Sequence, residues 1–492
     1  MEQHIPGIVL KDGLTQPVFD YKRCLFEKVY VETPVDTDGD GRLDLIAVYI
    51  RRPLETTQGM RVPAIYVANP YMLECNEDWY VPHDVDRDVS PYPQQHITES
   101  DITFDPSTVS FPQPRYPRAT VGYADTAPTE EIPLDCISDW YSYFNSRGYA
   151  YVFCGGLGTR GSQGFNCCGS PEETAAFKAV IDWLNGRCRA FTNLTDNIEI
   201  RADWCTGKVA MSGKSYLGTM CIAVASTGVE GLETIIPEAA ISNWYDYYRC
   251  NGLNLPAIGW QGDDLDILAK YCFSRAKDPE DYASVREAYA AWLEGIAADE
   301  DRDSGNYSRW WDMRNYLKAA DRFKASVFLV HGLADWNVKP THCVNLFAAM
   351  ECRGIPCKMM LHQGGHIYIH DLQGSRFNEM LHLWLDHWLY GIENGAAERI
   401  PNVLVQSNLD QDLWLASPSF PAVKGYTEPV LMPAQESGRL VDDLSATVYD
   451  RTRDNAAELL AELVLSERHP HCLRYLTAPL ETDTRISGTV QV

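Results

Sequence analysis

The chain has 492 residues, of which 45% are hydrophobic and 22% charged, proportions typical of a globular protein with two or three domains. Its 42 basic and 68 acidic residues give a net charge of −26, which argues against nucleic acid or a membrane surface as partners, because both attract clustered Lys and Arg. Fifteen cysteines without a C-x-x-C pair, no signal peptide and no membrane-spanning apolar run predict a cytoplasmic protein with free thiols.

Two β-rich segments flank an acidic turn near the N-terminus. The segment Val29–Val35 precedes the sequence DTDGDG at 36–41, and Leu43–Ile50 follows it. The acids at the first, third and fifth positions imitate a calcium loop, but Ala47 stands where the twelfth-position Glu belongs, and strands replace the flanking helices. A hairpin turn is therefore the better interpretation.

The following segments alternate between strand and helix, a pattern typical of a mostly parallel sheet covered on both sides. A buried strand is predicted at Val62–Ala68, and a long aromatic and Pro-rich loop occupies 72–133. Next come a predicted helix at Asp135–Arg147, a strand at Tyr149–Cys154 and a helix at Pro171–Asn185. The glycines at 156–161 match G-x-G-x-x-G, but more loop follows them instead of a helix, so a loop at the rim of the sheet is favoured over a dinucleotide site.

The stretch Lys208–Ser226, KVAMSGKSYLGTMCIAVAS, predicts a nucleophile. A buried strand turns sharply through a Gly-Lys-Ser sequence, ending at Ser215, into a small and apolar helix. Such a turn strains the serine backbone and exposes its oxygen above the sheet, while the helix start aims amides at a developing oxyanion. The sequence departs from the usual G-x-S-x-G because Leu217 holds the second glycine position and Gly218 follows it.

After a predicted strand at Leu232–Ile236, the segment 243–320 becomes rich in Trp and Tyr. Two amphipathic helices are predicted there, at Ala283–Ala297 and Ser308–Ala319. An insertion of this kind covers the strand ends as a cap, and a helical subdomain with aromatic packing is compatible with the same pattern.

Two further strands end in loops with polar side chains. The strand Ser326–His331 leads to Asp335, and the strand Cys357–Leu361 leads to the glycine loop that holds His366. Helices are predicted after these loops, at Thr341–Cys352 and Arg376–Tyr390. From about Pro401 the chain consists of short runs with frequent turn residues, which predicts a separate β domain.

The predicted catalytic groups are Ser215, Asp335 and His366. Each follows a strand, where open α/β sheets carry their catalytic groups, and their order along the chain is that of an α/β-hydrolase. A serine needs a neutral imidazole to take its proton, and a buried carboxylate holds that imidazole in the right tautomer. His362 and His370 flank His366 in a pattern that also suggests zinc, but glycines interrupt it and no acid lies close by, so we expect no metal and no cofactor.

These elements predict an α/β-hydrolase fold with a helical cap insertion, followed by a separate β domain, which the family resemblance described next implies to be a partial, jelly-roll-like β-sandwich. The expected domains are a hydrolase core in two parts at 1–242 and 321–398, a cap at 243–320 and a truncated C-terminal β domain at 399–492. A truncated sandwich leaves an unpaired edge and exposed apolar surface. Both favour association of two chains as a homodimer.

The sequence resembles the Xaa-Pro dipeptidyl-peptidase family of serine hydrolases, relatives of the cocaine-esterase-type acyl hydrolases. The resemblance covers roughly Val29 to Val492. The motifs that carry it are GKSYLGT (213–219), ISNWYDYYRCNGL (241–253), GWQGDDLD (259–266), HGLADWNVK (331–339) and HQGGH (362–366). The resemblance implies the same triad of Ser215, Asp335 and His366.

The resemblance also implies residues that stabilise the oxyanion and read the substrate amine. Tyr71, in the Asn-Pro-Tyr after a strand, matches the tyrosine that donates to the oxyanion together with the backbone N–H of Tyr216. Asp263 and Asn337 match the residues that bind the free α-amino group. The family usually has Glu at the position of Asp263, so its reach is one methylene shorter, and Asp264 is an alternative.

A flat aromatic pocket for the proline ring is implied as well. Trp244, Tyr247 and Tyr216 are its candidates, and core packing is the alternative role of these side chains.

The main functional hypothesis is a serine aminopeptidase that releases Xaa-Pro dipeptides from peptides with a free N-terminus, through an acyl-enzyme on Ser215. Measured against the family pattern, we expect the helical N-terminal domain to be missing and the C-terminal β domain to be smaller. An ester or amide acyl hydrolase of the cocaine-esterase kind is the second hypothesis. A non-catalytic binding remnant is the third, and an oxidoreductase is disfavoured.

Overall fold

The computed structural model describes residues 5–85, 96–132, 140–250, 252–257, 259–372, 374–422 and 481–482. The chain divides into two compact units, Met1–Ser417 and Pro418–Val492. Most of the predicted C-terminal β domain lies outside the described residues, and the described helices and strands all belong to the first unit.

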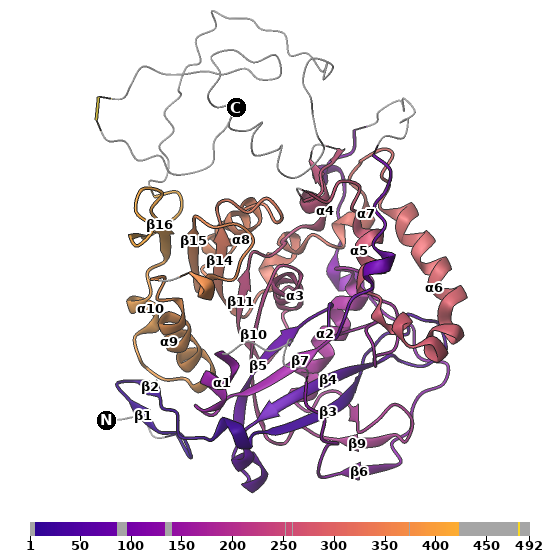
Figure 1. Cartoon of the computed structure of the whole chain (residues 1–492), viewed down its shortest axis with the longest axis horizontal. Coiled ribbons are helices and arrows are strands. Elements are labelled where there is room, and N and C mark those ends of the chain that lie inside the picture. Colours follow the sequence, from indigo (N-terminus) through magenta and orange to yellow (C-terminus); the bar gives the residue numbers. More distant parts are fainter. Residues whose placement is uncertain are drawn as a thin grey trace, which may run out of the picture. The chain divides into compact units, whose positions relative to one another are not determined.

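A thirteen-stranded sheet forms the centre of the first unit (Figure 1). Its strand order is β17-β16-β15-β14-β11-β10-β5-β7-β4-β3-β8-β9-β6. In chain order these strands are β3 (Leu25–Glu32), β4 (Leu45–Arg52), β5 (Val62–Ala68), β6 (Gly122–Ala124), β7 (Ala150–Cys154), β8 (Ala190–Phe191), β9 (Ile198–Ile200), β10 (Cys205–Lys214), β11 (Leu232–Glu238), β14 (Ser326–Gly332), β15 (Cys357–His362), β16 (Val403–Gln406) and β17 (Trp414–Ser417). Two short antiparallel pairs stand apart, β1 (Leu10–Lys11) with β2 (Leu14–Thr15) and β12 (Arg249–Cys250) with β13 (Leu253–Asn254).

The middle of the sheet is parallel, which confirms the interpretation of the alternating strands and helices. From β16 to β7 in the sheet order, every neighbouring pair of strands is parallel. Antiparallel pairing occurs toward the edges, where β3 and β4 form the predicted hairpin with Glu32 opposite Leu45. In the acidic turn of this hairpin, Asp36 accepts the amides of Gly39 and Gly41, and Asp38 pairs with Arg275 at 2.7 Å.

Helices cover both faces of the sheet, as the side chains of β5 show. Ile65 and Val67 belong to the apolar cluster that also contains Trp384 of α9. Between them, Tyr66 points to the opposite face and donates its hydroxyl to the carbonyl oxygen of Phe177 in α2 at 3.3 Å. The α-helices are α1 (Trp140–Asn145), α2 (Pro171–Leu184), α3 (Tyr216–Ala225), α4 (Trp244–Tyr248), α5 (Leu265–Cys272), α6 (Pro279–Asp299), α7 (Arg309–Asp312), α8 (Thr341–Cys352), α9 (Phe377–Tyr390) and α10 (Ala396–Arg399).

The segment predicted as a cap contains α4 to α7, which lie together in Figure 1. The predicted single helix at Ser308–Ala319 is wrong, since the chain forms α7 and then a separate 3₁₀ turn at Tyr316–Arg322. The break has a tertiary cause. Asn315 pairs with Asn243 as an isolated bridge, and the amide of Tyr316 donates to the Ser242 carbonyl at 3.1 Å, so these backbone groups leave the helix.

The first unit extends past residue 399, the predicted start of the C-terminal domain. Strand β16 pairs with β15, and β17 pairs with β16, so both complete the central sheet. The glycines at 156–161 lie in the loop between β7 and α2, where Gly158 has a φ of +72° and a Cβ would meet the amide of Asn166 at 2.6 Å. Among the described residues, every helix is too short or too polar to cross a membrane.

Candidate active site

Ser215 lies on the sharp turn between β10 and α3. Its φ of +62° and ψ of −126° are strained for a residue with a side chain, and such strain is typical of functional positions. Its amide donates to the Glu238 carbonyl at the end of β11, at 2.9 Å, which fixes the turn above the sheet. Tyr216 is the first residue of α3, whose first amides point toward the site of a developing oxyanion.

Two glycines make this turn possible and explain the departure from G-x-S-x-G. A Cβ at Gly213 would lie 2.5 Å from the Leu217 Cβ, so the residue before the turn has to be glycine. A Cβ at Gly218 would lie 2.6 Å from the Gly213 carbonyl oxygen and 3.1 Å from that of Glu238. The close approach of helix and strands therefore occurs one residue later than in the usual pattern, and Gly218 permits it.

Asp335 follows β14 and is buried, with both carboxylate oxygens engaged. Oδ1 accepts the amides of Asn337 at 2.9 Å and Val338 at 3.0 Å. Oδ2 lies 2.8 Å from Nδ1 of His366, and Nε2 of the buried His331 lies 3.5 Å from the same oxygen. This arrangement holds the His366 ring in the orientation that leaves its Nε2 for a second partner.

The loops of Asp335 and His366 are joined to each other and to the serine turn. The Leu333 amide donates to the His362 carbonyl at 2.7 Å, and the Ala334 amide donates to the Gly364 carbonyl at 3.2 Å. The Lys214 ammonium donates to the His366 carbonyl at 3.3 Å. The parallel strands that precede the three loops bring them to one edge of the sheet, and these hydrogen bonds connect the loops there.

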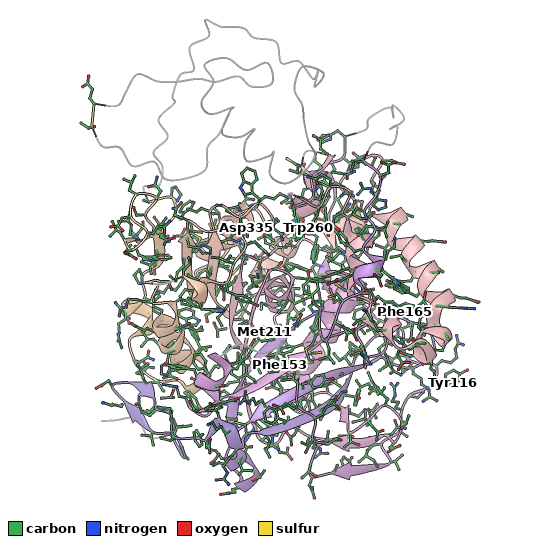
Figure 2. All side chains as sticks on the ribbon, viewed as in Figure 1. Tyr116, Phe153, Phe165, Met211, Trp260 and Asp335 are labelled. Atoms are coloured by element: carbon green, nitrogen blue, oxygen red, sulfur yellow. The ribbon has the colours of Figure 1, made fainter. Side chains whose placement is uncertain are left out.

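Ser215 and His366 open into one cavity of about 610 Å³. Figure 2 shows Asp335 and Trp260 toward one end of the sheet, with Met211 and Phe153 within it. The residues that line the cavity are Tyr71, Cys75, Glu77, Tyr80, Lys214, Ser215, Tyr216, Leu217, Ile241, Trp244, Tyr247, Tyr248, Trp260, Asp263, Leu268, Tyr271, Asn337, His366 and Tyr368. All the site residues predicted from the sequence are in this set except Asp335, which lies behind His366.

Asp263 is a buried carboxylate on the wall of this cavity. The Tyr248 hydroxyl donates to Oδ2 at 3.2 Å, whereas Oδ1 accepts no hydrogen bond within the described part of the chain. Burial, together with the negative charge of Asp264, raises the pKa of Asp263 to about 7, although the Tyr248 hydrogen bond opposes the shift. A cationic group in the cavity would stabilise the charged form of this carboxylate.

Asp264 does not share this position. It caps α5, and its carboxylate binds Arg249 at 3.0 Å and Arg302 at 2.5 Å. It is fully buried and does not line the cavity, so it is no substitute for Asp263 in binding a substrate amine.

The predicted aromatic residues surround the serine turn edge to face. The Tyr216 ring packs against Tyr71 at 5.7 Å and against Trp244 at 5.0 Å between centroids. Trp244 donates its indole N–H to Tyr316 at 3.0 Å, and the Tyr247 hydroxyl donates to Oδ1 of Asn337 at 2.7 Å. Burial raises the pKa of Tyr71 well above its usual range, so its phenol is a neutral hydrogen-bond donor.

Several residues that support the site were missed by sequence reasoning. The buried Glu173 of α2 accepts the Tyr216 hydroxyl at 2.8 Å on each oxygen, and burial raises the pKa of Glu173 to about 7. Glu238 accepts the amide of Ile369 at 2.9 Å and so ties the serine turn to the segment after His366. Tyr80 lines the cavity from the aromatic loop, where no periodicity marked it.

The other two histidines of the pattern at 362–370 do not line the cavity. His362 is buried, and its Nδ1 accepts the amide of Gly364 at 3.1 Å. The His370 ring packs near that of Tyr368, with 5.0 Å between centroids.

The parallel sheet, the serine turn and the order of the three polar loops define an α/β-hydrolase fold. The model of the X-Pro dipeptidyl-peptidase (S15) family matches residues 38–368, and that of the X-Pro dipeptidyl-peptidase C-terminal non-catalytic domain matches residues 394–492. The chain belongs to the S15 family of X-Pro dipeptidyl-peptidases.

Curated relatives match most of this chain but are longer. The Xaa-Pro dipeptidyl-peptidase of Pediococcus pentosaceus is 44% identical over 405 residues, which are 82% of this chain and 49% of that protein. The Xaa-Pro dipeptidyl-peptidase of Lacticaseibacillus paracasei is 40% identical over 494 residues, which are 99% of this chain and 61% of that protein. The chain thus spans about half to three fifths of the length of these relatives.

Among solved structures, a CocE/NonD family hydrolase from Staphylococcus aureus is similar, at 13% identity and a TM-score of 0.48. The match covers 82% of this chain and 63% of that one.

Proposed function

We propose that this chain is a serine peptidase that releases N-terminal Xaa-Pro dipeptides through an acyl-enzyme on Ser215. The observation that carries the proposal is the joint placement of Ser215, the His366–Asp335 pair and the buried carboxylate of Asp263 around one cavity. The S15 family membership and the two curated relatives support the same reaction.

In the proposed acylation step, His366 takes the proton of the Ser215 hydroxyl as the oxygen attacks the prolyl carbonyl. Asp335 holds the imidazole and stabilises the imidazolium that forms. The Tyr71 hydroxyl and the Tyr216 amide donate to the oxyanion of the tetrahedral intermediate. His366 then gives its proton to the leaving amine. In deacylation, His366 takes a proton from the water that attacks the acyl carbonyl and returns it to the Ser215 oxygen as the dipeptide leaves.

Substrate selection is proposed to rest on a charge and a flat surface. Asp263 and Asn337 bind the α-ammonium group of the substrate, and the charged pair is strong because Asp263 lies out of water. The rings of Tyr216, Trp244 and Tyr247 offer a flat apolar surface to proline. The substrates of the chain would therefore be proline-containing peptides with a free N-terminus.

The test compares Ala-Pro p-nitroanilide with its N-acetylated analogue on the full chain. We expect release of nitroaniline from the free amine and little from the acetylated compound, since acetylation removes the charge that Asp263 binds. Equal cleavage of both would favour the ester or amide acyl hydrolase instead. No cleavage, together with no labelling of Ser215 by a fluorophosphonate, would favour the non-catalytic binding protein.

The division into a two-part core, a cap at 243–320 and a C-terminal β domain forms part of the proposal. So does action in the cytoplasm, where the free thiols of the described cysteines would stay reduced.

A further inference from the structure

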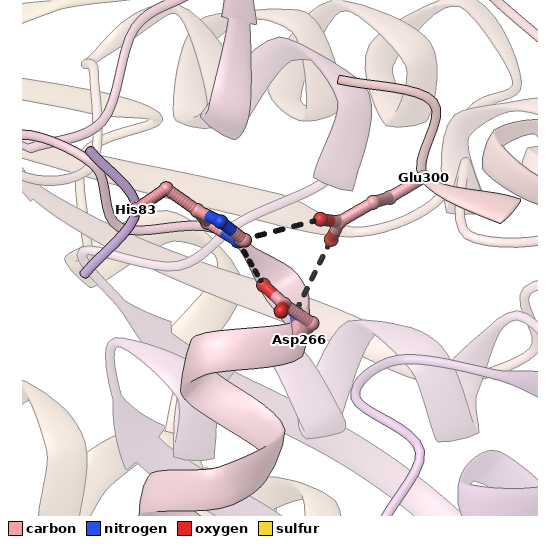
Figure 3. Close-up of side chains that lie close together, drawn as sticks. All are labelled: His83, Asp266 and Glu300. Carbon is pink, nitrogen blue, oxygen red and sulfur yellow. Dashed lines mark hydrogen bonds and ion pairs between the residues drawn. The ribbon is translucent and has the colours of Figure 1, made fainter. Parts of the chain in front are cut away.

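Three metal-ligating side chains from separate segments converge away from the cavity. His83 comes from the loop at 72–133, Asp266 from the first turn of α5, and Glu300 from the C-cap of α6 (Figure 3). Nε2 of His83 lies 2.9 Å from Oδ1 of Asp266 and 4.0 Å from Oε1 of Glu300. One donor atom of each residue lies within 4.8 Å of the others, and none of the three residues lines the cavity of Ser215.

Glu300 provides a second, independent observation. Its side chain is fully buried, and Oε1 accepts no hydrogen bond from any described residue. The other oxygen, Oε2, accepts the amide of Asp266 at 3.2 Å. The Glu300 carbonyl accepts Arg249 at 3.1 Å and the Trp311 indole at 3.2 Å, so its position is fixed. A buried carboxylate oxygen held in place without a donor calls for a partner.

The neighbouring cations do not supply that partner. Arg249 and Arg302 direct their guanidinium groups to Asp264. Lys270 lies 4.0 Å from Oδ2 of Asp266, which is not the oxygen that contacts His83. Two acidic side chains therefore face one imidazole, and Oε1 of Glu300 is left without a hydrogen-bond donor among the described residues.

We infer that His83, Asp266 and Glu300 bind one divalent transition-metal ion of the Zn²⁺, Co²⁺ or Mn²⁺ class. One imidazole nitrogen and two carboxylate oxygens suit these ions better than Ca²⁺, which prefers oxygen ligands alone. Metal–ligand bonds of about 2.0–2.2 Å place donor atoms about 3–4 Å apart, so a small movement of Glu300 closes the site. The His83 side chain is 30% exposed, which gives the ion a path from solvent.

This inference departs from the sequence-based expectation of no metal, because the three ligands come from segments that only the fold brings together. The role of the ion would be structural. The His83 amide donates to the carbonyl of Gly262, the residue before Asp263, at 2.8 Å. The Asn76 amide donates to the Tyr271 carbonyl, also at 2.8 Å. An ion on His83 would thus fasten the wall of the cavity that carries Tyr80 to the helices of the cap.

The experiment titrates the full chain, freed of metal by a chelator and dialysis, with Co²⁺ and with Zn²⁺ alone. We expect one ion per chain, a Co²⁺ visible spectrum without a thiolate charge-transfer band, and a higher thermal unfolding temperature. His83→Asn and Glu300→Gln should each weaken binding by at least about tenfold. His96→Asn, at another histidine of the same loop, and Asp40→Asn, in the separate acidic turn, should bind like the wild type.

Thermal unfolding without metal shows whether each variant is folded. If Glu300→Gln does not fold, the test rests on His83→Asn, which should fold because the His83 side chain is partly exposed. Four results would overturn the inference. These are a wild-type chain that binds neither ion, a thiolate band that assigns the ion to cysteines, binding unchanged in His83→Asn, and binding lost in either control. None of these readouts depends on peptidase activity, so failure of the proposed function leaves the test intact.

Discussion

The sheet edge that carries Ser215 and the cap wall that carries Asp263 face the same cavity, but they are built differently. At the sheet edge, parallel strands and backbone hydrogen bonds fix each polar residue, as in the amides that bind Asp335. On the cap wall, side chains form the contacts, since Tyr248 binds Asp263 within the wall and Tyr247 binds Asn337 of the Asp335 loop. We infer that the edge supplies the chemistry and that the wall selects the substrate, and substitutions on each side separate the two roles.

The largest effect is expected from Ser215→Ala at the sheet edge. Without the nucleophile, kcat for Ala-Pro p-nitroanilide should fall by at least about 10⁴-fold, while substrate still binds. Steady-state kinetics and fluorophosphonate labelling measure the loss. Retention of more than a small fraction of the activity would assign the nucleophile to another residue.

Tyr71→Phe tests the proposed oxyanion donor on the same side of the cavity. Loss of one preorganised donor should reduce kcat by about 10²–10³-fold with little change in KM, because the hydrogen bond forms in the transition state. A rise in KM at unchanged kcat would instead make Tyr71 part of the binding wall. Tyr271→Phe is the matched control, because the Tyr271 ring also packs against Tyr71, at 6.0 Å between centroids.

Asp263→Asn tests the cap wall. Removal of the charge should reduce kcat/KM for the free-amine substrate by roughly 10–100-fold, the worth of a hydrogen bond to a charged group, and leave the acetylated analogue unaffected. Glu77→Gln removes the other carboxylate among the described residues that line the cavity. A larger loss in Glu77→Gln than in Asp263→Asn would transfer amine recognition to Glu77.

The pH dependence sharpens the same assignment. Because burial and the charge of Asp264 raise the pKa of Asp263 to about 7, the free enzyme loses this carboxylate as the pH falls through that value. The preference for the free-amine substrate over its acetylated analogue should therefore fall by about fivefold from pH 7 to pH 6. In Asp263→Asn the ratio should be flat over this range. A wild-type ratio independent of pH would remove Asp263 from amine recognition.

The smallest effect is expected from Tyr247→Phe, which removes one hydrogen bond on the wall and keeps the ring. Asn337 then loses the donor at 2.7 Å, and kcat/KM for the dipeptide substrate should fall about 2–10-fold, mainly through KM. A fall of the size seen for Tyr71→Phe would mean that the wall takes part in the chemistry.

The same contrast explains how much the sequence could predict. Ser215, Asp335 and His366 are predicted from local rules, because each follows an apolar strand and the strand ends meet at one edge. The helix Thr341–Cys352 and the strand Val62–Ala68 were predicted with the bounds that the structure has. The substrate-binding role of the cap-wall residues is implied only by the family resemblance, because no local pattern tells whether a side chain such as Trp244 lines a pocket or packs in a core.

What escaped prediction depends on contacts between distant segments. Glu173 accepts the Tyr216 hydroxyl from a helix whose sequence shows only an amphipathic pattern. The helix predicted through residue 319 breaks because Asn315 pairs with Asn243. The cluster of His83 and two acids likewise has no spacing that marks it, and its ligands meet only when the long loop packs on the cap.

The most direct measurement of the central claim is mass spectrometry of the enzyme quenched in acid during turnover of an Ala-Pro ester. The account predicts an Ala-Pro acyl group on the peptide that contains Ser215, and none when the substrate amine is acetylated. Product formation with the acyl group on another residue, or with no acyl-enzyme on Ser215 even when the ester is in excess, would contradict it.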